Sequence, residues 1–332
     1  MIRRALSVSR GILLCSYLFS TFILPTIGLP GDSLNGERRQ DRWLYYFAFY
    51  GIFTDNKEVR NMDLFRDKLD STIPAENDYF IALSGGSRIY CKIWIPAAES
   101  AEQRFPAVLM LHGFPGLEQN QDMAPAFQRG GFASVFFSYR GVWGSHGDYS
   151  FSHLVEDVHA VLAHLTEHAE EYRIDPARIY LLGHSMGGFA ALNAIAEGAR
   201  VRGAVLMAPC DLGYKYEERP EEFAEFMTRK ERGYFRLSHE MAMEEDAAAN
   251  HARWRFSALP ERIPVDMPLH FIGATRDTAT PPEEHIQPLY IALRARGLRG
   301  SYTEIDDGHG FASHRIGLTE LVYEKLCQME QS

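Results

Sequence analysis

From Asp78 onward, short and almost continuous apolar runs alternate with longer segments that have the spacing of amphipathic helices. The runs are Ala107–Leu111, Phe132–Phe137, Ile179–Leu182, Ala204–Ala208 and Leu269–Gly273. A strand that is apolar along its whole length is buried on both faces, as in a mostly parallel sheet covered by helices. The sequence therefore predicts an α/β fold.

Two further segments support this prediction. Tyr79–Leu83 and Arg88–Ile95 have strand composition and are joined by Ser84–Ser87, a glycine-containing turn, so an antiparallel hairpin leads into the sheet. His153–Glu171 is predicted to be a helix because its apolar residues share one face. These residues are Leu154, Val155, Val158, Val161, Leu162 and Leu165.

One segment, Gly213–Arg262, interrupts the alternation of strands and helices. It holds acidic clusters, helix-forming stretches and scattered large apolar residues such as Phe223, Phe226 and Trp254. We interpret it as a helical cap inserted between two strands of the sheet. Because it follows the end of a strand where a parallel sheet places its active site, a lid is favoured over a surface elaboration.

Gly183-His184-Ser185-Met186-Gly187 has the pattern G-x-S-x-G, directly after one predicted strand and directly before a helical stretch. This context is that of a nucleophile elbow, a turn so tight that glycine must flank the serine. The hydroxyl of Ser185 is then presented at the carboxyl edge of the sheet. Without its flanking elements the pattern would be weak; placed here it predicts a nucleophile.

A serine hydroxyl needs a base to take its proton, and the base needs a carboxylate to orient it. Asp277 follows the run Leu269–Gly273, and His309 follows the predicted strand Tyr302–Ile305. Both therefore lie at the carboxyl ends of strands, in the order serine, acid, histidine. The alternatives are Asp211 as the acid and His285 or His314 as the base.

The oxyanion of the tetrahedral intermediate needs two preorganised donors. The backbone N–H of Met186, at the start of the helix after the serine, is one candidate. The other is the N–H of Phe114 in the loop His112–Gly116, since Pro115 has no N–H to donate.

These motifs together resemble the α/β-hydrolase superfamily, most closely its serine-aminopeptidase, prolyl-oligopeptidase-like and feruloyl-esterase-like members. They are His112–Gly116, Tyr139–Asp148, Gly183–Gly188, Gly273–Glu283 and Asp306–Phe311. The resemblance covers Asp78 to the C-terminus, with residues 213–262 at the place of the superfamily's variable cap. It implies an eight-stranded, mostly parallel sheet and hydrolysis through Ser185, His309 and Asp277, without a cofactor or metal. It implies an oxyanion hole at Phe114 and Met186, but no particular substrate.

Two other patterns have competing interpretations. His164–His168 reads H-x-x-E-H, an inverted zinc-protease motif, but it lies beside the polar flank of a predicted amphipathic helix, which is usually just solvated. Gly141–Gly147 is rich in glycine but lacks the ending of a phosphate loop. We interpret the latter as a loop bordering the site, in which Trp143 and His146 contact substrate or pack locally.

The N-terminal residues do not resemble the rest of the chain. Three arginines precede an uncharged, mostly apolar stretch, so residues 1–30 are interpreted as a signal peptide or a membrane anchor, and the protein as exported or membrane-attached. A wrongly assigned start codon, with a cytoplasmic protein, is the third interpretation. Residues 31–77 form an N-terminal extension with an aromatic run at Trp43–Phe53, either a core-packed helix or an interfacial surface.

The formal charge of −10, without a long basic run, makes nucleic acid an improbable partner. The cysteines outside residues 1–30 are widely spaced and indicate neither a disulfide framework nor a metal site. The sequence thus predicts that residues 78–332 form a serine hydrolase domain, which cleaves small carboxylic esters. A peptidase acting on short peptides is the alternative, and a catalytically silent binding protein would require a damaged triad.

Overall fold

A computed structural model describes residue 64 and residues 71–114, 120–228 and 235–332. These residues belong to one compact unit, which runs from Glu58 to Ser332. The predictions for residues 1–30 and for the aromatic run at 43–53 lie outside the described residues. Within the described ranges, no helix is both long and apolar enough to cross a membrane.

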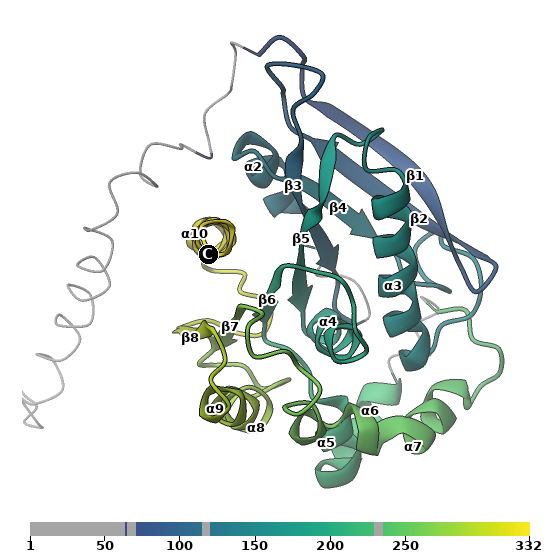
Figure 1. The fold of residues 1–332 in the computed structure, drawn as a ribbon. Helices are drawn as coiled ribbons and strands as arrows, with labels where there is room; N and C mark the ends of the chain where they lie inside the picture. The colour runs from purple at the N-terminus through teal and green to yellow at the C-terminus, as the bar shows by residue number, and fades with distance from the viewer. Residues whose placement is uncertain (1–63, 65–70, 115–119, 229–234) are drawn as a thin grey trace, which may run out of the picture. The chain divides into compact units, whose positions relative to one another are not determined.

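The described chain folds into one eight-stranded sheet with helices on both faces (Figure 1). The strands are β1 (Glu76–Ser84), β2 (Ser87–Ile95), β3 (Phe105–Leu111), β4 (Ala133–Phe137), β5 (Ile174–His184), β6 (Gly203–Met207), β7 (Leu269–Ala274) and β8 (Gly300–Ile305). The helices are α2 (Ala124–Arg129), α3 (Phe151–Glu167), α4 (Met186–Ala196), α5 (Leu212–Glu218), α6 (Pro220–Thr228), α7 (Ala242–Trp254), α8 (Pro282–His285), α9 (Gln287–Ala295) and α10 (Arg315–Glu330). This architecture confirms the predicted α/β fold with a mostly parallel eight-stranded sheet.

The strand order is β1-β2-β4-β3-β5-β6-β7-β8. β1 and β2 form the predicted hairpin, in which Ser84 pairs with Ser87. Gly85 and Gly86 both have positive φ, the conformation that a two-residue hairpin turn requires. β2 is also antiparallel to β4, and every later pair in the sheet is parallel.

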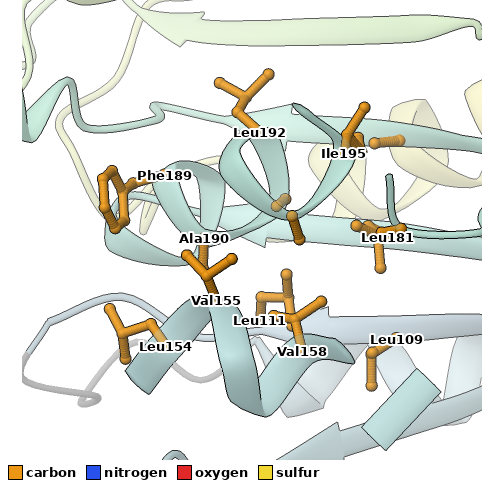
Figure 2. Close-up of a cluster of buried hydrophobic side chains, with 14 of the residues drawn as sticks. Leu109, Leu111, Leu154, Val155, Val158, Leu181, Phe189, Ala190, Leu192 and Ile195 are labelled. Atoms are coloured by element: carbon orange, nitrogen blue, oxygen red, sulfur yellow. The ribbon is translucent and has the colours of Figure 1, made fainter. Parts of the chain in front are cut away.

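Successive residues of the central strands point to opposite faces of the sheet, which explains their continuous apolar runs. Leu109 and Leu111 of β3 pack with α3 and α4, whereas Val108 and Met110 pack with α2 and α10. Figure 2 shows the first of these two cores, where side chains of β3 and β5 meet those of α3 and α4. Both faces of the strands are therefore buried.

The boundaries of α3 differ from the predicted helix at residues 153–171. The helix begins at Phe151 because the Ser150 hydroxyl accepts a hydrogen bond from the N–H of His153, at 3.2 Å, and caps its first turn. It ends at Glu167, and the chain turns before β5 begins at Ile174. The apolar face predicted from the sequence is the buried one.

Helices α5, α6 and α7 lie between β6 and β7, where the helical insertion was predicted. α5 begins at Leu212, and the Asp211 carboxylate caps it by accepting a hydrogen bond from the N–H of Tyr214. The insertion is anchored in the main core rather than resting on its surface. Trp254 at the end of α7 is fully buried, edge-on to Phe189 and Phe151.

Candidate active site

Ser185 lies between the end of β5 and the start of α4, in a strained turn with φ 56° and ψ −118°. A residue other than glycine adopts such a backbone only where its surroundings enforce it. Here the N–H of Ser185 donates to the carbonyl of Met207, and the carbonyl of Ser185 accepts from the N–H of Cys210. These bonds tie the turn to the segment that follows β6.

The glycines of the motif are required by the close approach of backbone atoms. A Cβ at Gly187 would lie 2.0 Å from the carbonyl oxygen of Leu111, and one at Gly183 would lie 2.6 Å from the carbonyl oxygen of Gly187. Both distances are far below a van der Waals contact. The turn therefore has the tight backbone geometry that a nucleophile elbow requires.

The structure brings the three predicted catalytic side chains together. Ser185 Oγ lies 2.9 Å from His309 Nε2, and His309 Nδ1 lies 2.7 Å from Asp277 Oδ2. Ser185 follows β5, Asp277 follows β7 and His309 follows β8, so three strand ends contribute to one hydrogen-bonded chain. This is the geometry in which a serine can pass its proton to an oriented imidazole.

The Asp277 carboxylate is completely buried but well supplied with donors. Its Oδ1 accepts the N–H groups of Ala279 and Thr280, at 2.8 and 2.9 Å, and its Oδ2 accepts the hydroxyl of Thr280 at 2.8 Å. Burial raises the pKa of Asp277, but the hydrogen bond and charge of His309 together with these donors outweigh it and hold the pKa at about 2. The carboxylate therefore stays charged beside the imidazole.

His184, the residue before Ser185, holds the loop that carries His309. Its Nε2–H donates to the carbonyl of His309 at 2.9 Å, and its ring is buried. Burial, together with the nearby His309, lowers the pKa of His184 to about 3, so the ring stays neutral. This contact could not be predicted from the sequence, because nothing in the order of residues shows that the elbow touches the loop after β8.

Phe114 and Met186, the two predicted oxyanion donors, line the same cavity as Ser185 and His309. Met186 is the first residue of α4, where backbone N–H groups have no partner within the helix. Gly113 allows the loop to approach, since a Cβ there would lie 3.1 Å from Ser185 Cβ. The ring of Phe114 packs against Phe226 of α6, with centroids 4.3 Å apart.

The cavity has a volume of about 310 Å³, at the small end for a ligand site. On the side of the insertion it is lined by Lys215 of α5 and by Glu222, Glu225 and Phe226 of α6. The insertion thus contributes charged and aromatic side chains to the wall around the serine. These charged residues could not be singled out from the sequence, because helical spacing alone does not show which polar side chain faces a cavity.

The alternative acid and bases have other partners. Asp211 accepts the N–H groups of Tyr214 and Phe256, both at 2.9 Å. His285 is buried, and its Nδ1 accepts the N–H of Asp211 at 2.9 Å. His314 Nδ1 lies 2.9 Å from Asp307 Oδ2. None of the three contacts Ser185 in the described structure.

The two remaining motifs lie away from the cavity. His164 Nε2 contacts the hydroxyl of Tyr172 at 3.1 Å, whereas His168 Nδ1 contacts Glu171 at 2.9 Å. Trp143 and His146 are not among the described residues that line the cavity. The loop that contains them is closed by one hydrogen bond from the N–H of Gly141 to the carbonyl of His146, at 3.1 Å.

Residues 108–315 match the family model described as the alpha/beta hydrolase family. The chain belongs to the alpha/beta hydrolase family. The match begins inside β3, ends at the first residue of α10 and contains all three residues of the Ser185–His309–Asp277 chain. The resemblance noted in the sequence motifs is thereby confirmed.

Among curated proteins, this hydrolase is similar to an uncharacterized peptidase, YuxL, of Bacillus subtilis. The two are 25% identical over 266 residues, 75% of this chain and 36% of YuxL. A second relative is an uncharacterized 31.7 kDa protein from the traX-finO intergenic region of Escherichia coli, 30% identical over 101 residues, 30% of this chain and 35% of that protein. The chain therefore spans about a third of the length of these relatives.

Solved structures show the same fold. An esterase of Pyrococcus furiosus, Pf2001, superposes with a TM-score of 0.56 at 17% identity, covering 76% of this chain and 92% of the esterase. A puromycin-hydrolyzing peptidase of Mycobacterium tuberculosis superposes with a TM-score of 0.61 at 17% identity, covering 80% of this chain and 42% of the peptidase. At this level of identity the likeness establishes the fold, which the two enzymes share.

Proposed function

We propose that this alpha/beta hydrolase is a serine hydrolase that cleaves carboxylic esters through an acyl-enzyme intermediate. The observation that carries the proposal is the continuous hydrogen-bonded chain from Ser185 Oγ through His309 to the buried Asp277. A serine in a strained elbow, with an imidazole 2.9 Å away and the predicted oxyanion donors Phe114 and Met186 lining the same cavity, is arranged for acyl transfer.

In the proposed reaction, Ser185 Oγ attacks the acyl carbon while its proton passes to His309 Nε2. Asp277 accepts the hydrogen bond of His309 Nδ1–H, fixes the tautomer that leaves Nε2 free, and stabilises the imidazolium. The N–H groups of Phe114 and Met186 stabilise the oxyanion. His309 then protonates the departing alcohol, and a water activated by the same imidazole hydrolyses the acyl-enzyme.

The second candidate function is a serine peptidase. The relation to YuxL favours it, because that relative is described as a peptidase. A specific feature of the cavity also favours it, since Glu222 and Glu225 could receive the ammonium or amide N–H groups of a short peptide. The same three residues would act in both reactions.

Turnover by the full chain tests the proposal and separates the two functions. We would compare p-nitrophenyl esters of increasing chain length with aminoacyl-naphthylamides, using the wild type and Ser185→Ala. The proposal expects ester turnover that Ser185→Ala abolishes. A kcat/KM for the naphthylamides far above that for the esters would reverse the choice of function. Equal turnover by Ser185→Ala would remove the assigned nucleophile.

For residues 1–30 we propose export or membrane attachment, supported by three arginines before an uncharged apolar stretch. Membrane association of the whole protein would follow from an uncleaved segment. Fractionation of cells expressing the full chain, with N-terminal sequencing of the product, tests this. An intact N-terminus on a protein found in the cytoplasm would contradict it.

A further inference from the structure

Lys215 is a buried cation in the wall of the catalytic cavity. It lies in the middle of α5, its side chain is 8% exposed, and it lines the cavity together with Ser185. Its Nζ lies 3.1 Å from Glu222 Oε2 of α6. Lysine is almost never buried unless it is paired, so the burial of Lys215 in the cavity that holds Ser185 calls for a physical explanation beyond the pair with Glu222.

Lys215 has more N–H donors than the described residues around it have acceptors for them. An ammonium group has three N–H donors, and among the described residues only Glu222 accepts one of them. A substrate that fills the cavity keeps solvent away from the other two donors. Unless the substrate brings an acceptor of its own, those donors become buried and unsatisfied, which opposes binding.

The other charges of the cavity decide what kind of acceptor fits. Glu222 and Glu225 line the same cavity, one turn apart on α6, so its wall carries two carboxylates and one ammonium. Within the described ranges, no cation forms an ion pair with Glu225. Glu222 is paired with Lys215 at 3.1 Å and with Arg219 at 3.8 Å, so among the described residues Glu225 is the wall carboxylate whose charge is not offset, and a carboxylate or phosphate on the substrate would meet that charge. A neutral group with both an acceptor and a donor would accept a hydrogen bond from Lys215 and donate one to a carboxylate.

We propose that Lys215 is a specificity-determining residue, which selects substrates bearing a neutral polar group, such as an amide, close to the scissile ester. The carbonyl of that group accepts a hydrogen bond from Lys215, and its N–H faces Glu222 or Glu225. Plain alkyl esters and esters with an anionic tail are discriminated against. This inference rests on the proposed function, because it names the substrate class of the same site.

Three acyl groups of similar length test the proposal on the acyl side. They are the p-nitrophenyl esters of N-acetylglycine, of valeric acid and of succinic acid, which carry an amide, a plain chain and a carboxylate. The spontaneous rate of each ester in the assay buffer, which includes attack by its own carboxylate or amide, is subtracted, and each kcat/KM is then divided by the rate of reaction with one common external nucleophile, which removes differences in intrinsic reactivity. The leaving-group side is tested in the same way with 2-acetamidoethyl acetate against pentyl acetate.

The wild type is expected to prefer the amide-bearing ester in at least one of the two series, by about 10- to 100-fold. Lys215→Met should reduce this preference to near unity, and Lys215→Gln, which keeps a neutral donor, should give an intermediate value. Lys92→Met is the matched control, because the ammonium of Lys92 lies on β2 and contacts Gln121. It should keep the wild-type preference.

A wild type that treats amide and alkyl esters alike in both series would overturn the inference, and this result needs no variant to fold. So would a preference that persists in both Lys215 variants, or a succinate ester that is the best substrate. Failure of the proposed function looks different. In that case the wild type hydrolyses none of the esters, p-nitrophenyl acetate included.

Discussion

His309 Nε2 lies 2.9 Å from Ser185 Oγ, although 124 residues separate the two in the chain. Their strands, β8 and β5, are not neighbours in the sheet, because β6 and β7 lie between them. The loop after β8 must therefore extend across the carboxyl ends of β7 and β6 to bring His309 to Ser185. Two contacts hold it there: the hydrogen bond from His184 to the carbonyl of His309, and the burial of Phe311 in the core beneath.

Replacing Asp277 with asparagine should impair catalysis while leaving the site assembled. The amide would retain the Oδ1 that accepts the N–H groups of Ala279 and Thr280, but its NH₂ would face His309 Nδ1 and favour the wrong tautomer. We expect kcat for a p-nitrophenyl ester to fall by about 10⁴-fold. Asp306→Asn is the control, since that carboxylate is exposed and pairs with Arg276. Equal losses in the two variants would contradict the assignment.

The same carboxylate should make the protein sensitive to acid. The pKa of Asp277 is held at about 2 in the fold, below its ordinary value of 3.8, so the folded state binds this proton more weakly than the unfolded state. Its stabilising contribution is therefore present above pH 4 and is lost as the pH falls from about 4 to about 2. The contribution should be about 2 kcal/mol in the free energy of unfolding. Denaturant titrations of the wild type and Asp277→Asn across this range measure it, and a constant difference would refute it.

Asp211 should give the opposite dependence at a higher pH. Burial raises its pKa to about 6, although the N–H groups of Tyr214 and Phe256 oppose the shift. The folded state thus binds this proton more tightly than the unfolded state, so stability declines as the pH rises from about 4 to about 6. Relative to Asp211→Asn, the wild type should lose about 3 kcal/mol of unfolding free energy over that interval. A wild type that gains stability relative to the variant over this range would show the sign to be wrong.

The elbow should not tolerate a single added methyl group. A Cβ at Gly187 would lie 2.0 Å from the carbonyl oxygen of Leu111, and its three nearest atoms all belong to the backbone of Leu111 and His112, which cannot swing aside as a flexible side chain would. We expect Gly187→Ala to lower the free energy of unfolding by about 3 kcal/mol or more and to abolish turnover. Gly317→Ala in α10 is the matched control, because a Cβ there meets nothing within 4 Å. This control should leave the free energy of unfolding unchanged or raise it by up to about 1 kcal/mol, as measured by thermal and denaturant unfolding.

Much of the fold could be predicted because its signals are local. The buried strands appear as apolar runs, the hairpin as a glycine pair between two strands, and the elbow as G-x-S-x-G between a strand and a helix. Asp277 and His309 could be placed because loops at the carboxyl ends of parallel strands share one edge of the sheet. The α3 boundary was misplaced because a short polar cap, Ser150, decided where the helix begins.

The rest depends on contacts between residues far apart in the chain. Thr280 could not be recognised as a partner of Asp277 from its position, and neither could His184 as the support of the His309 loop. Lys215 has the sequence environment of a surface lysine, and only the packing of α5 and α6 on the sheet edge buries it in the cavity. The sequence pattern locates the chemistry, whereas the three-dimensional packing determines the surroundings that select a substrate.

Covalent labelling tests the central claim, that Ser185 is an activated nucleophile, most directly. The full chain and its Ser185→Ala variant would each be treated with a fluorophosphonate. The intact mass of each protein is then measured by mass spectrometry, and a proteolytic digest locates the adduct. We predict one adduct on the wild type, carried by the peptide that contains Ser185, and none on the variant. An unlabelled wild type, or a variant labelled to the same extent, would contradict the account.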